Sequence, residues 1–481
     1  MTRTTSSLLF GPPSKAKLLA VFFLSLVLRL AFSFFLSKYY FGSITFEFGD
    51  SYSYSQSFIN LLTNGAYTFD FNYPDAYLYR PPVYPLFWGI HYLLFGAKNV
   101  YVAVAVTQSL LDAASSVLCV LLAARLGCSE RWSLFSGTVY TINPILLVHV
   151  PITGTETLGI FLTLLSIFLI LRSSKNVNIF LSALLLSLAV MVRQYLGVIV
   201  PLVLIYLFLS AYASGRFNFV RLLNKFAVFL LSFCFFVSPW FLRNAIELNK
   251  PTILMGETTG YAVYQEDYIA FRNFYNLYFV NITPIWNSIA LTGSDGISDY
   301  TEFGSLAEEM DLAANLAHSC GSSFLAWKQI PSSRPLSFSN VNSCNKDVVS
   351  AYEKLRLKAL DEGGLILSIK SPLANLSKSL FKSDLVIRSS SSLKVFLTKS
   401  VFTFRTLYIL LGLLSVVWLL RRPEAVFLLF PVLMICMISF GVRRQVEIRY
   451  LAQAEAVLIP FAALSLSRFY DLCKRCIRAF G

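Results

Sequence analysis

The sequence has few charged residues and almost no histidine. Of its 481 residues 14% are charged and three are histidine, whereas soluble proteins carry about 25% charged residues. Hydrophobic residues make up 56% of the chain. The scarcity of charge excludes an ordinary soluble enzyme. Because apolar runs long enough to cross a bilayer recur along the chain, the sequence predicts a polytopic membrane protein.

Acidic residues are also scarce. The chain has 26 of them against 40 lysines and arginines, a formal net charge of +14. Such a balance can indicate nucleic-acid binding, but much of the positive charge lies in short clusters between apolar runs. That placement is how membrane proteins set their topology. We therefore expect membrane lipids, and no nucleic acid, as partners.

Two further patterns are missing. No small-residue cleavage site follows the first apolar run, so we expect that run to stay as the first helix. No internal repeat is visible, although transporters often consist of repeated halves.

The apolar runs predict an all-α polytopic membrane protein with about ten transmembrane helices. A large extracytoplasmic loop domain is expected between spans seven and eight. The predicted spans are 18–36, 100–123, 132–149, 153–171, 178–192, 195–212, 225–241, 396–420, 424–441 and 450–467.

Lysines and arginines of the short connections fall on one side of these spans, which predicts that both termini are cytoplasmic. We expect a bacterial plasma membrane. Residues 1–241 would form an N-terminal transmembrane module whose first outer loop, 37–99, is catalytic. Residues 242–395 would form the extracytoplasmic loop domain, and 396–481 the last helices and a cytoplasmic tail. Within the loops, 83–95 predicts an interfacial helix, and 350–364 a helix that ends at its glycines.

Two groups of cysteines differ in their setting. Cys320 and Cys344 lie in the long polar segment and would be able to form a disulfide if that segment faces an oxidising compartment. "CKRC" at 473–476 has the spacing of a metal or redox motif, but no second pair or nearby histidine completes a site.

Ionisable residues at the outer ends of the spans are the candidates for function, because charge near the membrane is costly. Arginine suits phosphate, because its guanidinium makes bidentate hydrogen bonds. A carboxylate beside it suits a general base. A phospholipid-like anionic substrate fits this combination. The residues concerned are Asp50, Arg80, Glu156, Arg193, Arg243, Arg443, Arg444, Glu447 and Arg449.

Structural roles for the same residues are open at this point. Asp50 precedes the helical "SYSYSQSFINLL" and would serve as its N-cap. Glu156 would be an acid in the first turn of a helix, where the helix dipole stabilises a negative charge. Arg193 and Arg243 would bind headgroups. Tyr52 and Tyr84 are either interfacial aromatics or supports of the site.

Several blocks occur in order along the chain. They are an aspartate in the first outer loop, "RPPVYPLF", "ETLGIFLTLL", "VRQYLGVIVPLVLI", "PWFLRN" and "EIRYLAQAEAVLIP". In this order the sequence resembles the GT-C superfamily of integral membrane glycosyltransferases. It is similar in particular to bacterial relatives of protein O-mannosyltransferases and of lipid A aminoarabinose transferases.

The resemblance implies transfer of a sugar, with inversion, from a polyprenyl-phosphate donor to an outer-face acceptor. Asp50 would be the general base and Glu156 the second-loop acid. Arg80, and Arg449 with Tyr450, would lie beside the donor phosphate, and we place Arg193 in the same group. The mannosyltransferases carry an Asp-Glu pair where this chain has Asp50 and Ser51, so the second acid is absent or supplied by Glu47 or Glu156.

Two other functions compete with this hypothesis. A transporter or flippase for a lipid-linked sugar predicts repeats or charged residues in mid-span, such as Arg29 and Asp112. A scaffold would not need acids and arginines on one face. A divalent metal is compatible with some branches of the superfamily, but the sequence shows no ligand cluster.

Overall fold

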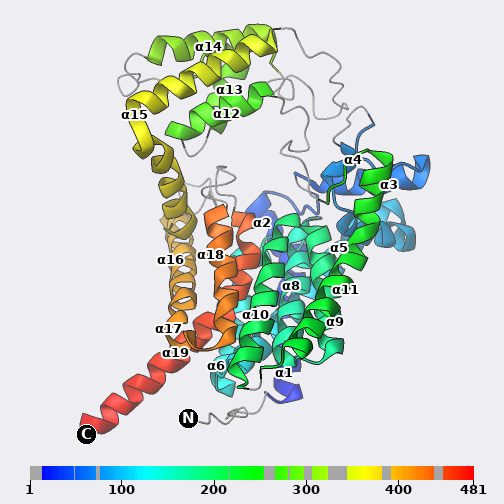
Figure 1. Cartoon of the computed structure of the whole chain (residues 1–481), viewed down its shortest axis with the longest axis vertical. Helices are drawn as coiled ribbons and strands as arrows, with labels where there is room; N and C mark the ends of the chain where they lie inside the picture. The colour runs from blue at the N-terminus through cyan, green and yellow to red at the C-terminus, as the bar shows by residue number, and fades with distance from the viewer. Residues whose placement is uncertain are drawn as a thin grey trace.

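A computed structural model gives the fold of the chain (Figure 1). The residues it describes are 13–47, 49–71, 76–215, 217–253, 266–279, 282–296, 306–322, 344–381, 392–437 and 448–480. Glu447, Arg443 and Arg444, which the sequence analysis selects, lie outside this part of the chain.

The described residues form an all-α polytopic membrane protein. Its main body is a helical bundle with a second helical layer above one end (Figure 1). The longer bundle helices are α1 (Lys15–Ala31), α5 (Val83–Leu126), α6 (Glu130–Ile142), α8 (Thr155–Arg172), α9 (Asn176–Val192), α10 (Ile199–Ala213), α11 (Phe219–Glu247), α16 (Ser392–Leu414), α18 (Leu429–Cys436) and α19 (Ala452–Phe480).

Short helices complete this body. They are α2 (Ser37–Phe41), α3 (Ser51–Asn64), α4 (Ala76–Tyr79), α7 (Pro144–Leu147), α17 (Val416–Leu419), a π-helical continuation of α1 (Phe32–Leu36) and 3-10 helices at Gln194–Val198, Pro423–Leu428 and Ile448–Tyr450. The helices α2, α3 and α4 belong to the first connection, between the first and second predicted spans.

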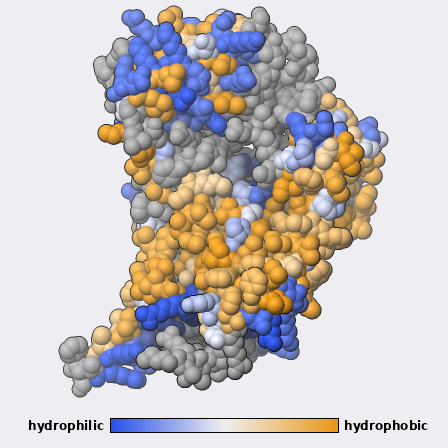
Figure 2. Space-filling model, viewed as in Figure 1, coloured by the Kyte–Doolittle hydropathy of each residue, from blue (hydrophilic) through white to orange (hydrophobic). Residues whose placement is uncertain are grey.

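Within the described residues each of the ten predicted spans coincides with a helix or a pair of successive helices, and residues 438–441 of the ninth span lie outside them. Seven helices in the described part of the chain are long and apolar enough to cross a membrane, and α9 and Pro423–Cys436 are shorter apolar helices. The count of ten therefore stays a prediction. Figure 2 shows an apolar belt over the bundle, with hydrophilic residues gathered above and below it.

Two ion pairs are buried inside the bundle. Arg29 of α1 donates from Nε to Asp112 Oδ2 of α5 at 2.6 Å, and Tyr140 donates to the other carboxylate oxygen at 2.6 Å. Arg405 of α16 donates from Nε to Glu455 of α19 at 2.8 Å, and Tyr408 also donates to that carboxylate. Each charge is thus neutralised by a partner on another helix, which is the usual condition for an ionisable group at membrane depth.

The helix α5 contains a sharp change of direction at Gly96. This residue has φ 71° and ψ 170°, a conformation that is essentially restricted to glycine. The break separates Val83–Phe95 from the spanning part, as the short apolar stretch 83–95 predicts. Its position at the membrane interface stays a prediction.

Four helices form the second layer: α12 (Glu266–Tyr278), α13 (Thr283–Thr292), α14 (Ala307–Cys320) and α15 (Asn345–Phe381). They enclose their own aromatic core, which includes Phe271, Phe274, Tyr275 and Tyr352. Cys320 and Cys344 form a disulfide that ties the end of α14 to the start of α15.

The division of the chain into domains at 1–241, 242–395 and 396–481 stays a proposal.

The predicted end of a helix at Gly363 and Gly364 is wrong, because α15 continues through both glycines to Phe381. A glycine costs a helix only about 1 kcal/mol relative to alanine. Helical residues on both sides and the contact of α15 with α12 offset that cost. The continued helix descends from the upper layer and contacts α16 and α18 (Figure 1).

Candidate active site

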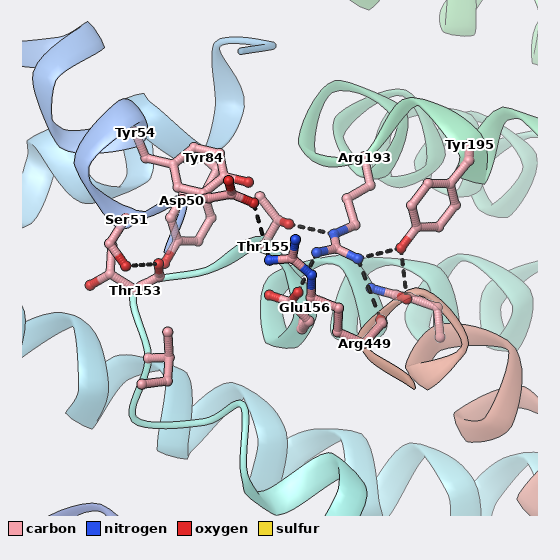
Figure 3. A network of polar contacts seen from close by, with 12 residues as sticks. Asp50, Ser51, Tyr54, Tyr84, Thr153, Thr155, Glu156, Arg193, Tyr195 and Arg449 are labelled. Carbon is pink, nitrogen blue, oxygen red and sulfur yellow. Dashed lines mark hydrogen bonds and ion pairs between the residues drawn. The ribbon is translucent and has the colours of Figure 1, made fainter. Parts of the chain in front are cut away.

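Hydrogen bonds join the two connections that carry the candidate acids. The amide of Thr153 donates to Phe46 O at 2.8 Å, and Ser51 Oγ donates to Thr153 O at 2.7 Å (Figure 3). From α5, Gln108 Nε2 donates to Val150 O and Ile152 O, both at 2.8 Å. These bonds fix the loop before α8 against the start of α3, and so bring Asp50 and Glu156 to the same end of the bundle.

Asp50 occupies the N-cap position of α3, but its side chain caps no backbone amide there. Its carboxylate is instead shared by two arginines. Arg80 Nη2 lies 2.9 Å from Oδ1, and Arg449 Nη1 lies 3.1 Å from Oδ2. Its side chain is 24% exposed. A carboxylate held on both oxygens by separate guanidiniums has a role beyond ending a helix.

Arg80 is held rigidly from α3. Its Nε donates to Ser53 Oγ at 2.7 Å and its Nη1 to Tyr54 OH at 3.0 Å, and its guanidinium lies 4.2 Å from the centre of the Tyr54 ring. Tyr67 OH donates to Arg80 O at 2.7 Å. Arg80 is buried, with a side chain that is 8% exposed. The sequence block "RPPVYPLF" therefore delivers a pre-oriented cation.

Glu156 and Arg193 form a second carboxylate–guanidinium pair beside the first (Figure 3). Arg193, which follows α9, donates from Nη2 to Glu156 and from Nε to Thr155 Oγ1. Its Nη1 donates to Tyr195 OH at 2.5 Å. Both side chains of the pair are less than 10% exposed.

Arg449 connects the two pairs. Its side chain binds Asp50, and its carbonyl oxygen accepts from Arg193 Nη1 at 3.5 Å. The ring of Tyr450 lies against both guanidiniums, 5.2 Å from that of Arg449 and 5.7 Å from that of Arg193. The N-cap of α3, the first turn of α8, the turn after α9 and the 3-10 helix before α19 thus meet in one network.

Electrostatics keep Asp50 ionised. Burial by itself raises the pKa of Asp50, but Arg80 and Arg449 outweigh it and lower the pKa from 3.8 to about 2. Because the pKa is lower in the folded state, the pairing stabilises the folded site at any pH above the ordinary carboxyl range. That stabilisation is lost only as the pH falls toward 2. At neutral pH the network holds charged carboxylates on charged guanidiniums.

The predicted supporting residues lie in different positions relative to the network. Tyr84 is fully buried, donates to Gln108 Oε1 at 2.8 Å and packs on Tyr54. Arg243 binds the carbonyls of Tyr77 at 2.7 Å and Tyr67 at 3.1 Å, so it holds the loop that carries Arg80 rather than Asp50 itself. Tyr52 is 55% exposed.

The position of the missing second acid is taken by Ser51, which is buried and bonded to Thr153 O. Glu47 is exposed, whereas Glu156 shares the network with Asp50 through Arg193 and Arg449. Glu156 is therefore the better placed of the two substitutes. The described residues contain no group of three or more His, Cys, Asp or Glu side chains fit to hold a metal ion.

Some residues of the network have no feature in the sequence that would identify them as part of a site. Tyr54, Gln108 and Thr155 are common residue types, and nothing in their spacing sets them apart. The Arg405–Glu455 pair does carry a signal, because both side chains are ionisable and lie in apolar runs. Arg193 carries the same signal, and the structure gives it more partners than the sequence suggests.

The bundle with a carboxylate and arginines at one end, under a separate helical layer, has the GT-C fold of integral membrane glycosyltransferases. The solved structures that share this fold include the archaeal oligosaccharyltransferase AglB from Archaeoglobus fulgidus. In complex with an inhibitory peptide and a dolichol-phosphate it superposes with a TM-score of 0.51 at 13% identity, over 96% of this chain and 52% of that chain. Its apo form gives 0.52 at 14% identity, over 97% and 52%.

The chain spans about half the length of the oligosaccharyltransferase chains it matches. ArnT from Cupriavidus metallidurans matches over 94% of this chain and 76% of its own at 15% identity, with a TM-score of 0.36, which is too low to carry an argument. No model of a known protein family and no curated protein sequence matches the chain. The resemblance of fold that the sequence blocks predict is confirmed.

Proposed function

We propose that this protein is a glycosyltransferase that moves a sugar from a polyprenyl-phosphate donor to an acceptor at the outer face of the membrane. The observation that carries the proposal is the network in which Asp50 and Glu156 lie against Arg80, Arg193 and Arg449. Three guanidiniums at the end of a membrane bundle suit the phosphate of a lipid carrier. The solved structure with the same fold that contains dolichol-phosphate supports this donor class.

In the proposed reaction the carboxylate of Asp50 and the guanidiniums of the arginines have different roles. Asp50 takes the proton of an acceptor hydroxyl, whose oxygen attacks the anomeric carbon of the donor. The bond from that carbon to the phosphate oxygen breaks, and the polyprenyl phosphate leaves with the electron pair. Arginines stabilise the charge that develops on the leaving phosphate. Attack opposite to the leaving group inverts the anomeric carbon.

A general base works best with a pKa near the working pH. In the present arrangement two arginines, Arg80 and Arg449, hold the pKa of Asp50 far below neutral pH. Binding of the donor phosphate to Arg80 and Arg449 would draw these cations from Asp50 and raise its pKa. The donor would therefore bind first and prepare the base for the acceptor.

A divalent metal is left open by this mechanism. The carboxylates of Asp50 and Glu156 are occupied by arginines, and no step above is assigned to a metal. We place the protein in a bacterial plasma membrane with both termini cytoplasmic, in agreement with the predicted topology.

The flippase hypothesis predicts charged groups along a path through the bundle. Arg29–Asp112 and Arg405–Glu455 are such groups, but each is a closed pair bonded to neighbouring backbone or tyrosine. They lock helices together rather than line a path. We therefore keep transfer as the proposed function.

The test is incubation of the purified protein with radiolabelled polyprenyl-phosphate sugars and a membrane extract as acceptor. We expect label in the extract with the native chain and not with Asp50→Asn. The matched control is Glu353→Gln, which breaks an arginine–carboxylate pair on α15 whose carboxylate side chain is 36% exposed. Absence of transfer with every donor rejects the proposal, and movement of intact donor between leaflets of sealed vesicles favours the flippase.

A further inference from the structure

The last part of α19 runs beyond the bundle. Figure 1 shows it leaving obliquely at the end opposite to α12–α15. Phe469 still packs on Trp418, with ring centroids 5.1 Å apart, and Tyr470 lies 6.1 Å from Trp132. All residues from 471 to 478 are exposed. We refer to residues 469–478 as the terminal segment.

One face of the terminal segment is apolar. Phe469, Leu472, Cys473, Cys476 and Ile477 follow the i, i+3, i+4, i+7, i+8 pattern and fall within an arc of about 140° at 100° per residue. Although apolar, this face is open: Leu472 is 48% and Ile477 73% exposed. Beyond Phe469, this face lacks a partner inside the described part of the chain.

The opposite face is cationic. Lys474, Arg475 and Arg478 lie there with one acid, Asp471, and all four are exposed. Arg468 adds a further cation where the segment leaves the bundle. An apolar face with cations opposite and beside it is the composition of helices that lie in a membrane surface.

We propose that the terminal segment binds the surface of the bilayer that α19 itself crosses, with its apolar face among the acyl chains and its cations on anionic phospholipid headgroups. Two observations select this partner. The segment continues a membrane-spanning helix without a break, so it emerges at that surface and not at a distance from it. Its charge is opposite to that of an anionic headgroup layer.

The proposal also accounts for "CKRC". The two cysteines lie on the apolar face, while Lys474 and Arg475 between them point to the other side of the helix. In this position the cysteines serve as small apolar residues among acyl chains, and the two basic residues reach the headgroups. The spacing then follows from the helical period and needs no metal or redox chemistry.

The test uses the full chain in nanodiscs of phosphatidylcholine, with or without phosphatidylglycerol. Cys234, Cys436, Cys473 and Cys476 are replaced by serine, and a single cysteine is introduced as Ile477→Cys or as Arg475→Cys. These positions lie on opposite faces of the same helical turns, so each is the control for the other. The cysteine carries an environment-sensitive fluorophore, and acrylamide quenching measures its exposure to water.

With phosphatidylglycerol present, we expect the label at 477 to be quenched several-fold less than the label at 475. Each basic residue should contribute on the order of a fivefold preference for the anionic surface. The difference should therefore shrink in phosphatidylcholine alone, and also when Lys474→Gln and Arg478→Gln accompany Ile477→Cys.

Two results overturn the proposal. Equal quenching at 477 and 475 in the anionic bilayer shows that the apolar face stays in water. Protection of 477 that is the same in both lipids, together with disulfide-linked dimers of the Ile477→Cys chain, shows that a second copy covers the face. Neither result depends on sugar transfer, so the proposed function is tested separately.

Discussion

At the scale of single residues, the arginines of the site are already paired with its own carboxylates. Each guanidinium that would hold a phosphate already contacts a carboxylate: Arg80 and Arg449 contact Asp50, and Arg193 contacts Glu156. A donor phosphate must compete with these internal anions. This competition makes the effect of removing a carboxylate different for binding and for transfer.

Asp50→Asn separates the two effects. The change keeps the size of the side chain but removes the charge that occupies Arg80 and Arg449. We expect polyprenyl phosphate to bind about tenfold more tightly, which corresponds to ~1.4 kcal/mol, while transfer falls by about 10²–10⁴-fold through loss of the base. Fluorescence titration of the purified variant measures the first effect and the radiolabel assay the second. Weaker binding than in the native chain would mean that Asp50 helps to hold the phosphate. The control Glu353→Gln should change neither quantity.

The Glu156–Arg193 pair allows stability and function to be distinguished. Glu156→Gln leaves a buried guanidinium without its counter-charge, which should lower the free energy of unfolding by ~3–5 kcal/mol. The double change Glu156→Leu with Arg193→Met removes both charges and should recover most of that loss, but not the transfer activity. Thermal unfolding in detergent and the radiolabel assay provide the two measurements.

A double variant that regains transfer would show that the pair is only structural. The matched control is Arg29→Met with Asp112→Leu, which removes another buried pair from inside the bundle. It should keep transfer, because neither residue contacts the network.

At the scale of helices, apolar runs were sufficient to place the helices of the bundle and the short helix before Gly96. These features depend on local composition, which a window of the sequence contains. The path of α15 was not predictable in this way, because its contacts with α12 and α18 join segments that are far apart in the sequence. The network around Asp50 was predicted only as a set of residues on one side; the bonds from Ser51 and Gln108 that assemble it depend on tertiary structure.

Gly96 sets the direction of the helix that begins with Val83 and Tyr84. Alanine at this position would meet no atom within 4 Å, so its only cost is backbone strain at φ 71°, about 1–3 kcal/mol. We expect Gly96→Ala to lower the unfolding temperature and to reduce transfer, because relief of the strain would move Tyr84 away from Tyr54 and Gln108. Thermal unfolding and the transfer assay measure both effects.

Gly197→Ala is the control for this experiment, since its new Cβ would meet only Val190, at 4.0 Å, and its φ is not positive. Its effect should be small. If Gly96→Ala behaved like Gly197→Ala in both measurements, the break in α5 would not position the site.

At the scale of the whole molecule, the two ends of the bundle differ in chemistry. One end carries the Asp50 network and, above it, the layer α12–α15 with its disulfide. The other carries the terminal segment of α19 and the basic residues of the short connections. Because stable disulfides form in oxidising compartments, the pair Cys320–Cys344 supports our proposal that the first end faces outward.

This orientation can be measured by labelling intact cells with a membrane-impermeant maleimide. In a chain whose other exposed free cysteines are serine, Glu47→Cys introduces an exposed thiol next to Asp50, and it should react before the cells are lysed. A cysteine introduced instead as Arg475→Cys, on the cationic and exposed face of the terminal segment, should react only after lysis. Labelling of 475 in intact cells, with protection of 47, would invert the topology. The network would then face the cytoplasm, where a disulfide is not expected to persist, and an acceptor at the outer face would be out of its reach.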